Sequence, residues 1–253
     1  MRHRSQMRFR RQLDFFLRRF LQEGKLPFTN VLTEETIAVA ITNAGVHWLD
    51  RVYSPLVTLW VFLGQVLSSD HSCRGAVARL IAHRVSQGQP ACSAETGAYC
   101  QARKRLPERF FSAVACLVGR SLDSQVDQKW LWKGRRVYMF DGTTVSMPDT
   151  PQNQEAYPQT DTQKPGLGFP IARLGAITSL SCGAILSLGF CRYAGKGQGE
   201  ISLLRRMWDL LRPGDVLLTD SLLSTWTEIL QLQQRGIDYV GQSVVEPRVL
   251  NPF

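Results

Sequence analysis

Two short, largely apolar runs, each followed directly by an aspartate, are the features that most restrict how this chain can fold. The first run is Val137 to Phe140, which precedes Asp141, and the second is Val216 to Thr219, which precedes Asp220. Runs of this length and character are typical of strands that are buried on both faces. We therefore predict that both segments are inner strands of one sheet.

The segments between and after these runs predict the rest of that sheet. Two stretches, Ile171 to Leu180 and Ala184 to Tyr193, are expected to form an antiparallel hairpin, and Met147 to Gly168 is expected to be a long loop. One helix is expected over Glu200 to Leu211, and a second after Asp220, ending at about Arg235. A further strand is expected over Ile237 to Val240. A hairpin joined to strand–helix units predicts an α/β fold with a mixed sheet flanked by helices.

The first part of the chain has a helical pattern instead. Apolar residues recur at helical spacing in three segments, Thr33 to Ala44, Cys73 to Val85 and about Glu95 to Arg120, the last interrupted by Pro107. Proline inside a helical pattern breaks or kinks the helix. We predict a basic, mainly helical region over residues 1–130 and an α/β domain over residues 131–253.

Positive charge is concentrated in the helical part. The net charge is +9, and residues 1–136 carry 21 basic and 10 acidic side chains, whereas residues 137–253 carry 9 and 11. A basic region of this kind suits a polyanion such as DNA, although a solvated basic surface explains it equally well. Three adjacent cations, Arg103, Lys104 and Arg105, are the candidate phosphate contacts, and a solvated helix face is the alternative.

Several protein classes are disfavoured by what the sequence lacks. No apolar run reaches the roughly 20 residues that cross a bilayer, and the arginine-rich start lacks the apolar stretch of a secretory signal. The six cysteines form no CxxC pair, and all four histidines lie between His3 and His83. The glycine-rich segments lack phosphate-loop spacing, and Ser221 lacks a nucleophile elbow. We expect a soluble cytoplasmic protein without zinc ribbons or histidine-dependent catalysis in its second half.

The two aspartates predict a metal site if their strands are neighbours. Asp141 and Asp220 each follow an expected strand, and reactive groups collect at the carboxyl ends of strands in open α/β sheets. Carboxylate oxygens suit Mg²⁺ or Mn²⁺, which assist phosphodiester chemistry without histidine. The alternative is that each aspartate only caps a turn or the following helix.

At these residues the sequence resembles the DDE transposases of bacterial insertion sequences, in the insertion-sequence-four branch. The resemblance covers about Cys92 to Val240 and is carried by four segments, Tyr99 to Pro107 (YCQARKRLP), Phe140 to Thr150 (FDGTTVSMPDT), Gly168 to Arg173 (GFPIAR) and Leu211 to Asp220 (LRPGDVLLTD). It implies a ribonuclease-H-like core in which Asp141 and Asp220 are the first two members of the Asp-Asp-Glu triad. It also implies metal-dependent cleavage and strand transfer at transposon ends, with double-stranded DNA as partner and a nucleoid-associated location.

The chain departs from the family pattern at two places. The family has a basic residue after its second aspartate, where this chain has Ser221. The third carboxylate of the family lies in a Tyr-x2-Arg-x3-Glu-x6-Lys pattern on a helix, and here Tyr239 and Glu246 match while the arginine and lysine do not. Pro247 disfavours helix at Glu246. We therefore expect a core that is incomplete at its C-terminal end and lacks the catalytic glutamate.

Two functions stay open on this basis. The chain is either a truncated transposase, working as a homodimer or paired with a full-length transposase, or a catalytically inactive DNA-binding remnant or inhibitor of one. A nuclease or phosphatase of the same fold is a further alternative, because a fold alone does not determine its substrate.

Overall fold

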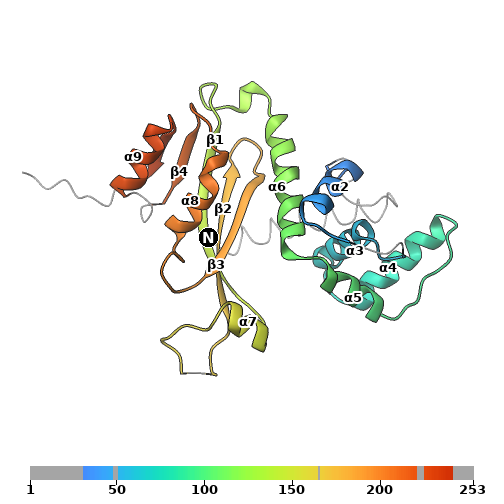
Figure 1. Ribbon diagram of the computed structural model, residues 1–253. Coiled ribbons are helices and arrows are strands. Elements are labelled where there is room, and N and C mark those ends of the chain that lie inside the picture. Colours follow the sequence, from blue (N-terminus) through green and yellow to red (C-terminus); the bar gives the residue numbers. More distant parts are fainter. Residues whose placement is uncertain (1–30, 48–50, 165, 221–224, 242–253) are drawn as a thin grey trace, which may run out of the picture. The chain divides into compact units, whose positions relative to one another are not determined.

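The computed structural model describes residues 31–47, 51–164, 166–220 and 225–241 (Figure 1). The chain divides into two units between Val114 and Ala115. The predicted domain boundary at residue 130 stays a prediction. Three features of the sequence, the arginine-rich segment 1–20, Ser221 and Glu246, lie outside the described residues.

Helices make up the described part of the first unit. They are α2 (Glu34–Asn43), α3 (Pro55–Leu67), α4 (Cys73–Ser86), α5 (Gly97–Arg105) and the start of α6 (Glu108–Ser124). Hydroxyl caps begin three of them, because Thr33, Ser54 and Ser72 accept hydrogen bonds from the backbone N–H three residues later. Such caps satisfy N–H groups that the helix itself leaves unpaired.

The predicted helices α2 and α4 are confirmed, and so is the break at Pro107. The expected helix over Glu95 to Arg120 is two helices, α5 and α6, separated by Leu106 and Pro107. Apolar residues from α3, α4 and α5 form a core of Val61, Ala76, Val77, Leu80 and Tyr99. Among the described residues, no helix combines the length and apolar character needed to cross a bilayer.

A five-stranded mixed sheet forms the centre of the second unit, as predicted. The strands are β1 (Val137–Ser146), β2 (Ile171–Ser179), β3 (Ile185–Arg192), β4 (Val216–Thr219) and β5 (Asp238–Gly241), in the spatial order β3-β2-β1-β4-β5. β2 runs antiparallel to β1 and β3, whereas β4 is parallel to β1 and β5.

Two expectations for β1 were wrong. The strand does not end before Asp141 but continues to Ser146, because β2 pairs with it along its whole length, from Ser179 at one end to Ile171 at the other. Nor is it buried on both faces. Tyr138 and Phe140 are buried, whereas Met139, which points to the opposite face, is 37% exposed.

The segment between β1 and β2 is also more ordered than a simple loop. It contains a short helix, α7 (Pro151–Ala156), whose first turn is capped by the Thr150 hydroxyl. After it, the Gln159 side chain donates to two backbone carbonyls and accepts from two backbone N–H groups. One amide side chain therefore supplies the hydrogen bonds that a regular element would otherwise provide.

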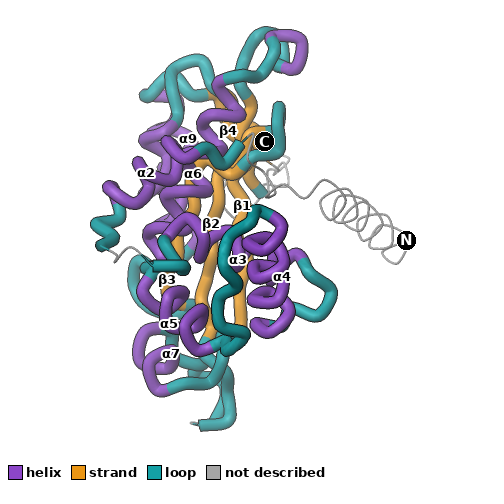
Figure 2. Tube along the Cα trace, turned by 90° about the vertical axis from the view of Figure 1, so that its right-hand side faces the viewer, coloured by secondary structure: helices purple, strands orange, loops and turns teal. Residues whose placement is uncertain are grey.

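Two helices cover one face of the sheet. They are α8 (Glu200–Met207), continued by a 3-10 turn at Trp208–Leu210, and α9 (Trp226–Gln234). Figure 1 shows the two helices beside the strands, and Figure 2 shows α9 beside β4 in a view turned by 90°. Their apolar faces join the buried residues of the strands in one core, which includes Tyr138, Phe140, Ile177, Leu203, Leu204, Trp208, Leu217 and Leu232.

A row of three glycines lets α8 approach the sheet closely. Gly142, Gly175 and Gly189 lie directly opposite one another on β1, β2 and β3. A Cβ atom at Gly175 would come within 3.0 Å of the Phe140 ring and 3.2 Å of the Leu203 Cβ, so a larger residue has no room there. Glycine in a strand often marks such a close approach.

Candidate functional site

The parallel pairing of β1 and β4 brings the two predicted aspartates to one edge of the sheet. Met139 pairs with Leu218 in this ladder. Two residues further along both strands, the same register places Asp141 opposite Asp220. Neighbouring strands lie about 4.8 Å apart, so the backbones that carry the two carboxylates are adjacent. The sequence predicted a shared site only if these two strands were neighbours, and the pairing of β1 with β4 meets that condition.

Both aspartates are exposed at this edge. One oxygen of Asp141, Oδ1, accepts a hydrogen bond of 2.8 Å from the backbone N–H of Gly142. Thr219, which precedes Asp220, shares a hydrogen bond of 2.5 Å with the Tyr239 hydroxyl on β5. The strand end that carries Asp220 is therefore tied to its outer neighbour as well as to β1.

The nearest described glutamate on α8 lies on the other side of β1. Glu200 packs against Gly142 on the face of β1 toward which the buried Phe140 side chain points. Its Oε1 forms an ion pair of 2.7 Å with Nη1 of Arg173. Asp141 points to the opposite face, so Glu200 does not join the aspartate pair. Within the part of the chain that the structure describes, no three acidic, histidine or cysteine side chains are grouped to hold a metal ion.

The two carboxylates nevertheless fit a magnesium-type ion in their chemistry. Mg²⁺ is usually held by one or two protein carboxylates, with water and substrate phosphates completing its coordination. Exposed carboxylates on adjacent strands leave that space open.

Comparison with known proteins adds no family assignment. No protein-family model matches this chain, and no curated protein matches it. The resemblance to DDE transposases therefore stays a prediction from the four sequence segments.

The three predicted phosphate contacts at the end of α5 do not share one environment. The Arg103 guanidinium donates to Oε1 of Gln65 at 3.0 Å and lies over the rings of Phe62 and Tyr99, at 5.8 and 5.6 Å from their centroids. Lys104 and Arg105 are exposed. A phosphate therefore has direct access to the second and third cations, whereas Arg103 is engaged within its own unit.

Arg105 also lines a cavity of about 680 Å³ in the first unit. The cavity wall includes Tyr53, whose buried hydroxyl adjoins the Cys92 thiol. Burial, together with the neighbouring Cys92 thiol, raises the pKa of Tyr53 to about 12. The phenol therefore stays protonated and available as a donor at neutral pH.

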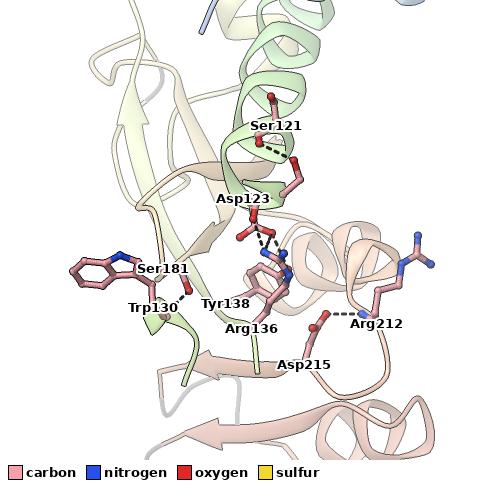
Figure 3. A network of polar contacts seen from close by, with 9 residues as sticks. Ser121, Asp123, Trp130, Arg136, Tyr138, Ser181, Arg212 and Asp215 are labelled. Atoms are coloured by element: carbon pink, nitrogen blue, oxygen red, sulfur yellow. Dashed lines mark hydrogen bonds and ion pairs between the residues drawn. The ribbon is translucent and has the colours of Figure 1, made fainter. Parts of the chain in front are cut away.

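A buried polar network lies at the other end of β1 (Figure 3). Oδ2 of Asp123, on α6, accepts hydrogen bonds from Nη1 of Arg136 at 2.8 Å and from the Tyr138 hydroxyl at 3.2 Å. Burial and the Asp123 charge raise the pKa of Tyr138. This network was not predicted from the sequence, because Asp123 lies on α6 and Arg136 lies 13 residues later, directly before β1. The pair Arg135 and Arg136, directly before an apolar strand, was its one visible sign.

A second buried carboxylate borders the same end of the sheet. Oδ2 of Asp215 accepts a hydrogen bond of 2.7 Å from the backbone N–H of Arg212, and this turn leads directly into β4. Burial raises the pKa of Asp215, and the nearby Arg136 partly opposes that rise.

Proposed function

We propose that this chain is a DNA-binding protein of the DDE transposase type, with Asp141 and Asp220 as the carboxylates of a metal-dependent strand-cleavage site. The observation that carries the proposal is the parallel register of β1 and β4, which brings Asp141, within β1, beside Asp220, directly after β4. The strand order and the four sequence segments that resemble this family support it.

The residues of this chain have two roles in such a site. Asp141 and Asp220 would hold Mg²⁺ or Mn²⁺, which supplies Lewis-acid activation of water or a 3′-hydroxyl and stabilises the leaving oxygen. The cations Lys104 and Arg105, exposed on α5, would contact backbone phosphates and contribute salt-dependent affinity. Transposon-end DNA is the substrate that the resemblance implies.

A second candidate function is DNA binding without cleavage. It is favoured because, among the described residues, Asp141 and Asp220 are not joined by a third possible metal ligand. The DDE family uses three carboxylates. Such a protein would occupy transposon ends or pair with a full-length transposase, and it would inhibit transposition instead of performing it.

Metal binding tests the site directly. We expect saturable Mn²⁺ binding, followed by electron paramagnetic resonance, to weaken at least about tenfold in Asp141→Asn and in Asp220→Asn, because each change removes a direct ligand. The matched control is Asp161→Asn, an exposed aspartate of the same unit. Equal Mn²⁺ affinity in all four proteins would exclude the assignment.

A plasmid-nicking assay separates the two candidate functions. Mn²⁺-dependent nicking that is lost in both site variants but kept in Asp161→Asn supports the cleavage function. Salt-sensitive DNA binding with no nicking at any metal concentration supports the second candidate. Nicking that is unchanged in Asp141→Asn and Asp220→Asn would show that the activity arises elsewhere.

A further inference from the structure

A small, arginine-lined cavity lies in the second unit, away from the aspartate pair. Its volume is about 290 Å³, and its wall includes Arg120, Asp123, Arg136 and Arg212. Arg136 directly precedes β1, and Asp141 lies five residues further along that strand, a distance of about 16 Å at the usual rise per residue. The cavity is therefore at the opposite end of the parallel strands from the proposed metal site.

The cavity carries excess positive charge. Arg120 and Arg212 are exposed, and within the described residues neither guanidinium has a hydrogen-bond or ion-pair partner. Arg136 is engaged only through Nη1, which donates to the backbone oxygen and to Oδ2 of Asp123. Three arginines and one aspartate are thus among the residues that line the cavity. An anion would satisfy the unused N–H groups.

Asp123 adds a second, independent requirement. Asp123 is 7% exposed, and Arg136 and Tyr138 both donate hydrogen bonds to its Oδ2. The other oxygen, Oδ1, is buried and has no hydrogen-bond partner among the residues that the structure describes. A buried acceptor without a donor is unfavourable and rare in folded proteins. The cavity therefore calls for a ligand that accepts hydrogen bonds from guanidinium groups and also donates one.

We propose that this cavity binds a phosphate group that carries a proton, either as inorganic phosphate or as a phosphomonoester. Guanidinium groups match phosphate oxygens in a bidentate geometry. A P–OH group supplies the donor that Oδ1 of Asp123 lacks, whereas a phosphodiester and sulfate have no such proton. Internal phosphates of a DNA strand are therefore disfavoured. This site is independent of the proposed cleavage function, because it uses neither Asp141 nor Asp220.

The preference for phosphate over sulfate tests the chemistry. At pH 6, where a phosphomonoester is about half protonated, isothermal titration calorimetry of the full chain should show phosphate binding at least about tenfold tighter than sulfate at matched ionic strength. The double variant R120Q/R212Q should lose at least about tenfold in phosphate affinity. Both side chains are exposed and unpartnered, so the variant should fold normally, which circular dichroism checks.

A control with the same charge change is available in the second unit. Lys164 and Lys196 are exposed, and K164Q/K196Q should bind phosphate as the unchanged chain does. Equal phosphate affinities in the two double variants, equal affinities for phosphate and sulfate, or no saturable phosphate binding would each overturn the proposal.

A second titration distinguishes the two sources of the phosphate. The ligand is a short DNA duplex with or without a 5′-terminal phosphate. If the terminal phosphate raises the affinity of the unchanged chain but not that of R120Q/R212Q, a DNA end is the source. If inorganic phosphate binds as expected but the terminal phosphate has no effect, free phosphate is the ligand. Both outcomes support a protonated-phosphate site.

Discussion

Replacing Gly175 by alanine tests the close packing of α8 on the sheet. The added Cβ would lie 3.0 Å from two carbons of the Phe140 ring and 3.2 Å from the Leu203 Cβ. Both neighbours are 1% exposed and cannot move into solvent. Overpacking of a core typically costs about 1–3 kcal/mol, and the lower entropy of the unfolded alanine chain offsets about 0.4–1 kcal/mol of this. We expect a net loss of roughly 1–2 kcal/mol.

Urea unfolding followed by circular dichroism measures this loss, and Gly189→Ala is the matched control. Gly189 lies in the same row of glycines, but its added Cβ would meet the ends of flexible side chains, the Leu203 Cδ2 at 3.2 Å and the Met207 Sδ at 3.6 Å. That variant should stay within about 0.5 kcal/mol of the unchanged chain. If Gly175→Ala were as stable as the unchanged chain, or more stable than Gly189→Ala, α8 would not approach the sheet as described.

Two further predictions concern single charged residues. Arg103→Ala should lower the free energy of unfolding of the first unit by about 1–2 kcal/mol, because the Gln65 hydrogen bond and the ring contacts are lost. Replacing the exposed Lys104 by alanine should change this free energy by less than about 0.5 kcal/mol. Equal urea midpoints for the two variants would contradict the prediction. Asp215 has a raised pKa in the folded state because it is buried, so its contribution to stability is full below its ordinary pKa and is lost as the pH rises through the folded value. The asparagine of the Asp215→Asn variant does not titrate and keeps an oxygen for the Arg212 N–H. The stability of this variant relative to the unchanged chain should therefore rise between pH 3 and pH 7. A difference in the free energy of unfolding that does not depend on pH would refute the reasoning.

Elements bounded by strong local signals were predictable from the sequence. β4 occupies the expected Val216–Thr219, because an apolar run enclosed by Pro213, Gly214 and Asp215 on one side and Asp220 on the other has few alternatives. Pro107 marked the break between α5 and α6 for a similar local reason. The parallel pairing of β1 with β4 was a condition for a shared aspartate site and not itself a prediction, and the ladder between these strands meets it.

Features that depend on tertiary partners were not predictable in this way. The polar half of β1, from Asp141 to Ser146, forms a strand because β2 supplies its hydrogen bonds, and its residue types gave no apolar run to detect. The Asp123 network joins residues that are far apart in the sequence. That Oδ1 of Asp123 is buried without a donor among the described residues can be recognised only from the structure. A lone aspartate near the end of a helix has the same appearance in sequence whether it faces water or a cluster of arginines.

The turn before β4 has a consequence for the aspartate pair. The hydrogen bond from the Arg212 N–H to the Asp215 carboxylate closes a four-residue turn, and Val216 then begins to pair with β1. Asp220 lies five residues after Asp215, so the length of this turn sets both the position of Asp220 along β1 and the face of the sheet toward which it projects. One inserted residue there, if absorbed by a slip of β4, would shift Asp220 by about 3.3 Å and reverse its face. The spacing of the two carboxylates is thus encoded at the far end of the strand, in residues that touch neither of them.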